Sequence, residues 1–247
     1  MAAADKAARA RSATTSDSAM EVLHNIPVDL DQEAILGQLR LRKRSVSVEK
    51  IVQELLELVR PIARPKAVYQ VAYVDNKMES SVRIGGVEFT SRLLRINLDK
   101  VERAFAYVAT CGTELDEIAV PSSDLLKYYC LDTIKVMILR TARSYLKDYL
   151  IRTYALGRIS AMSPGRLKDW PVTQQEPLFR ILGDVEKLIG VRLTDTYLMQ
   201  PLKSVSGIYF PTEVRFESCQ LCPRAVCSWR RAPYDPSLAQ KYAEKLQ

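Results

Sequence analysis

The residues best suited to metal or redox chemistry stand near the C-terminal end of the chain. There Cys219, Cys222 and Cys227 form a C-x2-C-x4-C array. A C-x2-C turn directs two thiolates toward one metal centre, and a third cysteine so close is difficult to explain by packing alone. The array therefore predicts an iron–sulfur cluster or a zinc ion, with unligated thiols as the alternative.

Three cysteines leave one ligand position of such a centre open or filled from elsewhere. Cys111, at the end of an expected strand, and Cys130, inside an expected helix, are candidates, although both positions are also typical of core packing. The only histidine, His24, is far away in sequence, which disfavours a Cys3His zinc site. We find no Ser/His/Asp arrangement and no paired carboxylates that indicate acid–base or nucleophilic catalysis.

A second informative stretch runs from Gly190 to Phe210, with the sequence GVRLTDTYLMQPLKSVSGIYF. Its apolar residues predict two strands, one before and one after Pro201, which interrupts strand pairing. The small residues 204–207 allow the backbone to approach a neighbouring group closely.

The elements around these stretches follow from hydrophobic spacing and from capping residues. We expect helices at 31–39, at 48–59 with Ser47 as its cap, from Ser122 or Ser123 to about 155, and at 177–188. We expect strands at 67–74, 82–84 and 87–89 (a hairpin around Gly85-Gly86), 104–110 and 159–163, whereas 93–98 is either helical or extended. Strands and helices without regular βαβ units predict an α+β fold with a mostly antiparallel, twisted sheet backed by long helices.

Composition limits the function classes. The 247 residues carry a net charge of +7, and the pI is about 9.1, which favours an acidic partner. Residues 1–19 predict a disordered tail without a secretory signal, and no apolar run is long enough for a membrane span. Cysteines without an export signal indicate the reducing cytoplasm.

Residues 193–210, LTDTYLMQPLKSVSGIYF, resemble the LTE-x-x-AM-x-P-x-x-SVSG-x-YF block of the activation domain of cobalamin-dependent methionine synthase. Upstream, Ser163-Pro164-Gly165 resembles the R-x-A-P-G-Y loop of the same family. The resemblance implies a C-shaped α+β domain around a twisted antiparallel sheet. We assign it to residues 20–216 and treat 217–247 as a cysteine-containing extension that the family does not supply.

The resemblance also implies a ligand, S-adenosylmethionine, and its contacts. Residue by residue, it places binding contacts at Ser163, Gly165 and Tyr209. Two family contacts differ here, because Ala161 stands where the family has an arginine and Arg166 where it has a tyrosine. Arg166 or Arg158 is a candidate to replace the lost cation.

The function implied is reactivation of a corrinoid-dependent methyltransferase by reductive methylation of cobalamin presented by that partner. S-adenosylmethionine supplies the methyl group, and a metal cluster in the cysteine array or an acidic electron carrier supplies the electron. One alternative is a non-catalytic corrinoid-docking subunit that no longer binds S-adenosylmethionine. A zinc-stabilised nucleic-acid-binding protein is a further alternative, but the scattered positive charges disfavour nucleic acid and no membrane partner is expected.

Overall fold

The computed structural model describes residues 20–39, 41, 45–213, 216–227 and 230–246. The expected tail, 1–19, lies outside the described residues. A seven-stranded sheet has the order β4-β3-β2-β5-β9-β6, with β1 also paired to β2. Its strands are β1 Met20–Leu23, β2 Lys66–Lys77, β3 Ser81–Ile84, β4 Val87–Thr90, β5 Arg103–Thr110, β6 Ile159–Met162 and β9 Ser204–Pro211. Every pairing between these strands is antiparallel, which confirms the predicted sheet.

Helices cover both faces of this sheet. The long helices are α3 Val46–Ile62 and α5 Leu125–Thr153, and the shorter ones are α2 Gln32–Gln38, α4 Arg92–Asn97, α6 Gln175–Leu182, α7 Val185–Ile189 and α8 Pro236–Leu246. Short 3-10 turns are η1 Glu114–Glu117, η2 Val172–Gln174 and η3 Ser218–Leu221. A small separate sheet pairs β7 Arg192–Leu193 with β8 Met199–Gln200.

The side chains of β5 show how the strand alternation separates two cores. Phe105 and Tyr107 belong to the core under α2, α3 and α5, whereas Ala104, Ala106 and Val108 belong to the core under α4, α6 and α7. Successive side chains of a strand point to opposite faces, so one strand fills both cores. Because β5 is covered on both sides, seven of its eight residues are buried.

Capping residues fix where the helices begin, and two of them differ from the prediction. Ser45, rather than Ser47, caps α3 and accepts a hydrogen bond from the Val48 N–H. Asp124 caps α5 in place of Ser122 or Ser123, and its carboxylate accepts from the Lys127 N–H at 2.9 Å. Both serve the same physical need, an oxygen for an unpaired N–H of the first turn.

The helix expected at 177–188 is two helices. Gly183, at φ +69°, ends α6, and Asp184 starts α7 by accepting a hydrogen bond from the Lys187 N–H. The undecided segment 93–98 is the helix α4, because Ser91 caps it. Around Gly85-Gly86 the hairpin of β3 and β4 forms as predicted.

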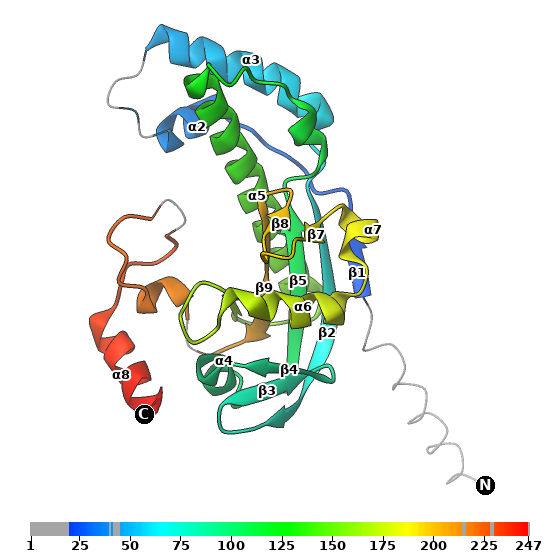
Figure 1. Ribbon diagram of the computed structural model, residues 1–247, viewed down its shortest axis with the longest axis vertical. Coiled ribbons are helices and arrows are strands. Elements are labelled where there is room, and N and C mark those ends of the chain that lie inside the picture. Colours follow the sequence, from blue (N-terminus) through cyan, green and yellow to red (C-terminus); the bar gives the residue numbers. More distant parts are fainter. Residues whose placement is uncertain (1–19, 40, 42–44, 214–215, 228–229, 247) are drawn as a thin grey trace, which may run out of the picture.

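In Figure 1 the molecule has the outline of a letter C. The upper arm consists of α2, α3 and the first part of α5, and the lower arm contains the segment after β9 together with α8. In the described part of the chain, no helix combines the length and apolar character needed to cross a membrane.

Candidate ligand cavity

A cavity of about 570 Å³ lies where the end of β6, the start of β9 and the segment after β9 meet. This volume falls within the usual range of small-molecule sites, about 300–1,000 Å³. Three stretches that are distant in sequence, 163–166, 204–206 and 218–227, supply most of its wall. Leu139 of α5, Val172, Gln175 and Met199 complete it. The cavity therefore brings the Ser-Pro-Gly loop and the cysteine array together.

The Ser-Pro-Gly loop follows β6 directly. Gly165 has φ +77°, and its N–H donates to the carbonyl of Trp170 at 2.8 Å. The positive φ favours glycine, and a Cβ added at Gly165 would lie 3.2 Å from the Val172 side chain, which would have to shift slightly. The carboxylate of Asp169 accepts hydrogen bonds from the Ser91 hydroxyl and from the Leu93 N–H, which fixes the far end of this loop to α4.

The start of β9 forms the second side of the cavity and packs tightly on β6. A Cβ at Gly207 would lie 2.4 Å from the Met162 carbonyl oxygen and 2.8 Å from Ser163 Oγ. The close backbone approach expected for residues 204–207 is thus an approach to β6. Pro201, in a cis peptide with Gln200, precedes the strand.

A hydrogen-bonded glutamine joins this wall to α6. The Ser206 hydroxyl donates to Gln175 Oε1 at 3.0 Å, and Gln175 Nε2 donates to the Tyr197 carbonyl at 2.7 Å. The Gln175 side chain is buried and its polar atoms are satisfied, as burial requires. No sequence pattern marked Gln175, because its partners are up to 31 residues away.

Tyr209 lies in the core behind the cavity and is not among the residues that line it. It is 1% exposed, and its ring stacks on Tyr107 with centroids 4.4 Å apart. Its hydroxyl donates to the Arg143 carbonyl at 3.3 Å. Burial, then the nearby Tyr107, raises the pKa of Tyr209 well above its ordinary value. The predicted ligand contacts Ser163 and Gly165 do line the cavity.

Cys219, Cys222 and Cys227 all line the cavity, and none is in a disulfide. Cys219 is buried, and the other two are half-buried. Within the described residues, no three Cys, His, Asp or Glu side chains form a group that could hold a metal ion. The predicted iron–sulfur cluster or zinc ion is therefore not supported by the arrangement of the thiols.

The two remaining cysteines are separate from the array. Cys111, at the end of β5, and Cys130, in α5, are fully buried in the core beneath the helices. Burial raises the pKa of Cys111 to about 12 and also raises that of Cys130. Both therefore stay protonated thiols at neutral pH, as the packing interpretation of these residues expects.

Arginines hold the cysteine segment in place. The Arg230 guanidinium donates to the carbonyls of Cys219 at 3.2 Å, Cys222 at 3.4 Å and Arg224. Arg231 pairs with Glu217 at 3.1 Å, and both side chains are largely buried. The side chains of Arg230 and Arg231 thus bond backbone carbonyls and a carboxylate, and the backbone N–H of Arg231 donates to Cys219 Sγ at 3.5 Å.

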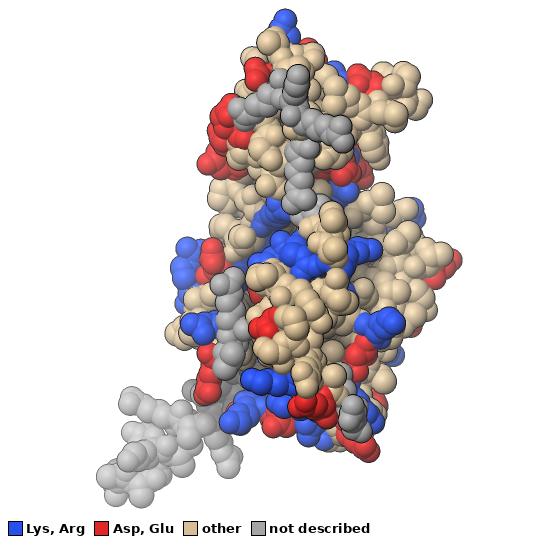
Figure 2. All heavy atoms as spheres, turned by 90° about the vertical axis from the view of Figure 1, so that its left-hand side faces the viewer, with Lys and Arg blue, Asp and Glu red and all other residues tan. Residues whose placement is uncertain are grey.

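The charge of the cavity wall is positive. Arg166 and Arg224 line it, and no Asp or Glu does among the described residues. Figure 2, which faces the open side of the C, shows Lys and Arg side chains gathered across the middle of this face. Arg158, the other predicted substitute, lies elsewhere and donates to the Glu213 carbonyl at 3.1 Å.

Comparisons with known proteins agree with this architecture. Residues 164–219 match the family described as "Vitamin B12 dependent methionine synthase, activation domain". A solved structure described as "Crystal Structure of the MetH Reactivation Domain bound to AdoHcy" aligns with a TM-score of 0.54 and 15% sequence identity, covering 82% of each chain. No curated protein sequence matches the chain.

The segment that matches the family, 164–219, contains the Pro-Gly turn and β9 and ends at Cys219, so most of the cysteine segment lies beyond it. The resemblance is confirmed: the chain has the fold of the solved MetH reactivation domain, and residues 164–219 match the activation-domain family.

Proposed function

We propose that the chain binds S-adenosylmethionine in the cavity and presents its methyl group to a corrinoid held by a partner methyltransferase. The observation that carries this proposal is the position of Ser163-Pro164-Gly165. These residues, in the segment that resembles the family's ligand loop, line a cavity large enough for a small molecule. The solved relative is described as bound to AdoHcy, the product of methyl donation.

The chain's own contribution is binding and orientation. Backbone groups of the Pro-Gly turn and of β9 offer donors and acceptors to an adenine edge and an amino-acid end. Holding the methyl donor at a fixed place beside the reacting cobalt converts a bimolecular encounter into an oriented one. The corrinoid belongs to the partner methyltransferase, and an acidic electron carrier supplies one electron to it. We propose that both proteins act in the cytoplasm. S-adenosylmethionine leaves as S-adenosylhomocysteine after giving its methyl group to the reduced corrinoid.

Isothermal titration calorimetry with S-adenosylmethionine tests the binding step. Two glycines provide a matched pair of variants, because both have positive φ angles, +77° at Gly165 and +76° at Gly86. Alanine at either position strains the backbone by about 1–2 kcal/mol, but only Gly165 borders the cavity, where the added Cβ also lies 3.2 Å from the lining residue Val172. We expect Gly165→Ala to weaken ligand binding and Gly86→Ala to leave it unchanged. An absence of binding heat at millimolar ligand would refute the proposal.

The catalytic step needs the partner. Mixing the protein with an oxidised corrinoid methyltransferase, a chemical reductant and S-adenosylmethionine should produce the absorbance of methylated cobalamin. The same mixture without the protein is the control. Equal rates of methylation in the two mixtures contradict the reactivation function.

A second candidate is a docking subunit that has lost the ligand. The observation in its favour is Ala161, which is buried at 3% exposure in β6 where the family has an arginine. Tyr209 also supports this candidate, because it lies behind the cavity and its hydroxyl donates to the Arg143 carbonyl. Tight binding to a corrinoid protein without any binding of S-adenosylmethionine would favour this function.

The metal content of the cysteine array stays a prediction, and the mechanism above uses no metal. Anaerobic purification followed by an absorbance spectrum and metal analysis tests it. Stoichiometric iron with a charge-transfer band establishes a cluster, stoichiometric zinc establishes a structural site, and the absence of both leaves three free thiols.

A further inference from the structure

We propose that Arg224, together with Arg166, binds the carboxylate of the amino-acid end of the ligand. This inference rests on the proposed function and deepens it. It assigns a binding role to the segment after β9, which lies mostly outside the matched family segment.

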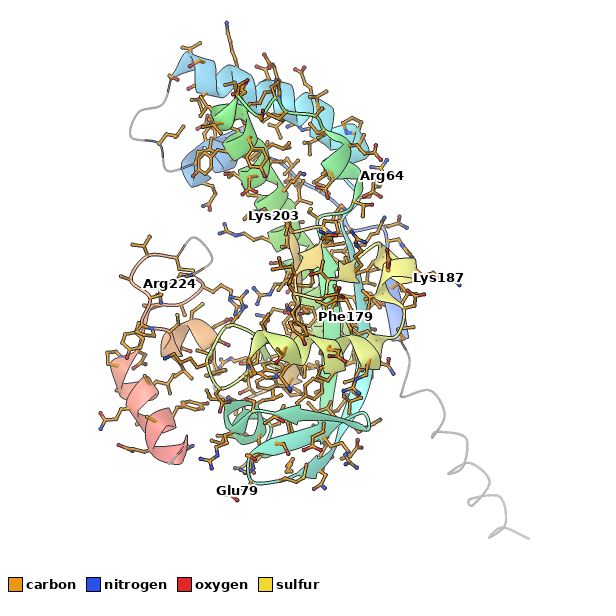
Figure 3. All side chains as sticks on the ribbon, in the orientation of Figure 1. Arg64, Glu79, Phe179, Lys187, Lys203 and Arg224 are labelled. Atoms are coloured by element: carbon orange, nitrogen blue, oxygen red, sulfur yellow. The ribbon has the colours of Figure 1, made fainter. Side chains whose placement is uncertain are left out.

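The two arginines line the same cavity and come from segments that are far apart in the sequence. Arg166 belongs to the Ser-Pro-Gly loop, and Arg224 belongs to the cysteine segment. Among the described residues, neither guanidinium has a hydrogen-bond or ion-pair partner. Lys203, in contrast, is already paired with Asp132 at 2.7 Å. Figure 3 shows Arg224 on the loop that follows β9, on the open side of the molecule, across from Lys203.

A cavity lined by two arginines and by no described Asp or Glu favours the carboxylate of an amino acid over its ammonium group. The planar fork of guanidinium N–H groups matches the two oxygens of a carboxylate. The described lining residues include no Asp or Glu that could pair with the ligand's ammonium group. Recognition at this end of the cavity therefore depends on the carboxylate more than on the ammonium.

A buried hydroxyl next to the cysteines is also without a partner. Ser218 is 2% exposed and lines the cavity, and its Oγ makes no hydrogen bond with the described residues. Leaving a buried polar atom unpaired is costly, so a ligand group that bonds it is favoured. The other buried polar side chains that line the cavity are those of Ser163, Gln175 and Ser206. Of these, Gln175 already bonds Ser206 and Tyr197.

The backbone that carries Arg224 is fixed without the ligand. The Arg230 guanidinium bonds the carbonyl of Arg224 itself and those of Cys219 and Cys222. Glu217 forms a bridge to Ala161 of β6 and accepts the charge of Arg231. Because the backbone here is already held by these bonds, the ligand has to order only the arginine side chain, which favours tight binding.

Ala161 is not among the residues that line the cavity and packs in the core together with Tyr209. Among the described lining residues the cations are Arg166 and Arg224, and Arg224 comes from the segment after β9.

Calorimetry with two ligands tests this inference. Decarboxylated S-adenosylmethionine keeps the adenosine, sulfonium and ammonium groups and lacks only the carboxylate. We expect the wild-type protein to bind S-adenosylmethionine at least tenfold more tightly than the decarboxylated form. Arg224→Ala and Arg166→Ala should each weaken S-adenosylmethionine about ten- to hundredfold and leave the decarboxylated ligand unchanged.

Controls separate a lost contact from a lost fold. Arg158→Ala removes an arginine outside the cavity and should change neither affinity. Arg224→Lys keeps the charge and should retain part of the discrimination. The wild-type comparison of the two ligands requires no variant and is decisive even where a variant unfolds.

The possible outcomes separate the carboxylate assignment from the proposed function. Equal wild-type affinity for both ligands overturns the carboxylate assignment and leaves the proposed function standing. Discrimination that survives Arg224→Ala in full overturns the role of Arg224. A failure of the wild-type protein to bind either ligand overturns both this inference and the proposed function.

Discussion

The two walls of the cavity are held together by different kinds of interaction. The wall of β6 and β9 is backbone packed on backbone, with Gly207 against the Met162 carbonyl and a satisfied glutamine behind it. The wall after β9 has a single 3-10 turn and is held by arginine side chains that bond carbonyls and Glu217. The sheet wall tolerates little change, whereas the C-terminal wall carries free charges and can change its chemistry without altering the sheet.

The largest effect is expected on the sheet wall. Gly207→Val adds atoms where a Cβ alone would lie 2.4 Å from the Met162 oxygen, a backbone atom that cannot move aside cheaply. Overpacking of this kind costs about 3 kcal/mol of unfolding free energy. Urea denaturation measures it. Gly37→Ala is the control, because nothing lies within 4 Å of that Cβ and alanine favours the helix. A Gly207 variant as stable as the wild type contradicts the tight contact.

On the C-terminal wall, Glu217→Gln removes the partner of Arg231. Both side chains are less than one-fifth exposed, at 19% and 16%, so the loss leaves a largely buried cation unpaired. We expect about 1–2 kcal/mol of destabilisation, less than for a fully buried pair. The exposed pair of Arg92 and Glu79, 3.8 Å apart, provides the control variant Glu79→Gln, which should change stability little. Equal effects of the two variants would show that Glu217 contributes no more than a surface charge.

The core behind the sheet wall predicts a pH dependence. Burial, followed by Tyr107, raises the pKa of Tyr209, so between about pH 10 and its folded pKa the folded chain holds a proton that the unfolded chain has lost. The contribution of Tyr209 to stability is therefore fully present below about pH 10 and is lost above it, by about 1.4 kcal/mol per pH unit. Tyr209→Phe should flatten the alkaline decline measured by denaturation at several pH values. An unchanged slope contradicts the burial of its hydroxyl.

The smallest effect is expected at the half-buried thiols. Without a bound metal, Cys222→Ser should change the unfolding free energy by no more than about 0.5 kcal/mol. Cys219→Ser, at a position with 8% exposure, should cost more because a polar hydroxyl replaces a buried thiol. Thermal denaturation with metal analysis checks both. A large loss of stability at Cys222 together with release of a metal ion would establish the predicted metal site.

Most elements of the fold could be predicted because their determinants are local. The alternation in β5, the Gly85-Gly86 turn and the buried stripe of α3 each follow from residues a few positions apart. The errors also have local causes. Two serines near the start of α5 are as plausible caps as Asp124, which is the residue that caps it. The apolar spacing runs through Gly183 without a break, although Gly183 ends α6.

The candidate site was only partly predictable. Ser163 and Gly165 could be placed by their motif, and the structure puts both on the cavity wall. Tyr209 was assigned from its motif as well, but the strand register at Ala161 and Phe105 places its side chain on the face covered by α5. The face of the sheet to which a side chain points depends on how its strand pairs with its neighbours. A shift of one residue in the strand register moves every side chain to the opposite face.

The sequence alone determined the antiparallel α+β fold, the Pro-Gly turn and the presence of three neighbouring thiols, because each depends on backbone preferences and spacing within a short stretch. Only the tertiary structure decided that the thiols share a cavity with the Pro-Gly turn, that Tyr209 lies behind it, and that Arg224 and Arg166 both line it. The 3-10 turn η3 and the bonds of Arg230 and Arg231 set those relations. Which distant segments of the chain share a cavity is fixed by the packing of the whole chain, and no local pattern encodes it.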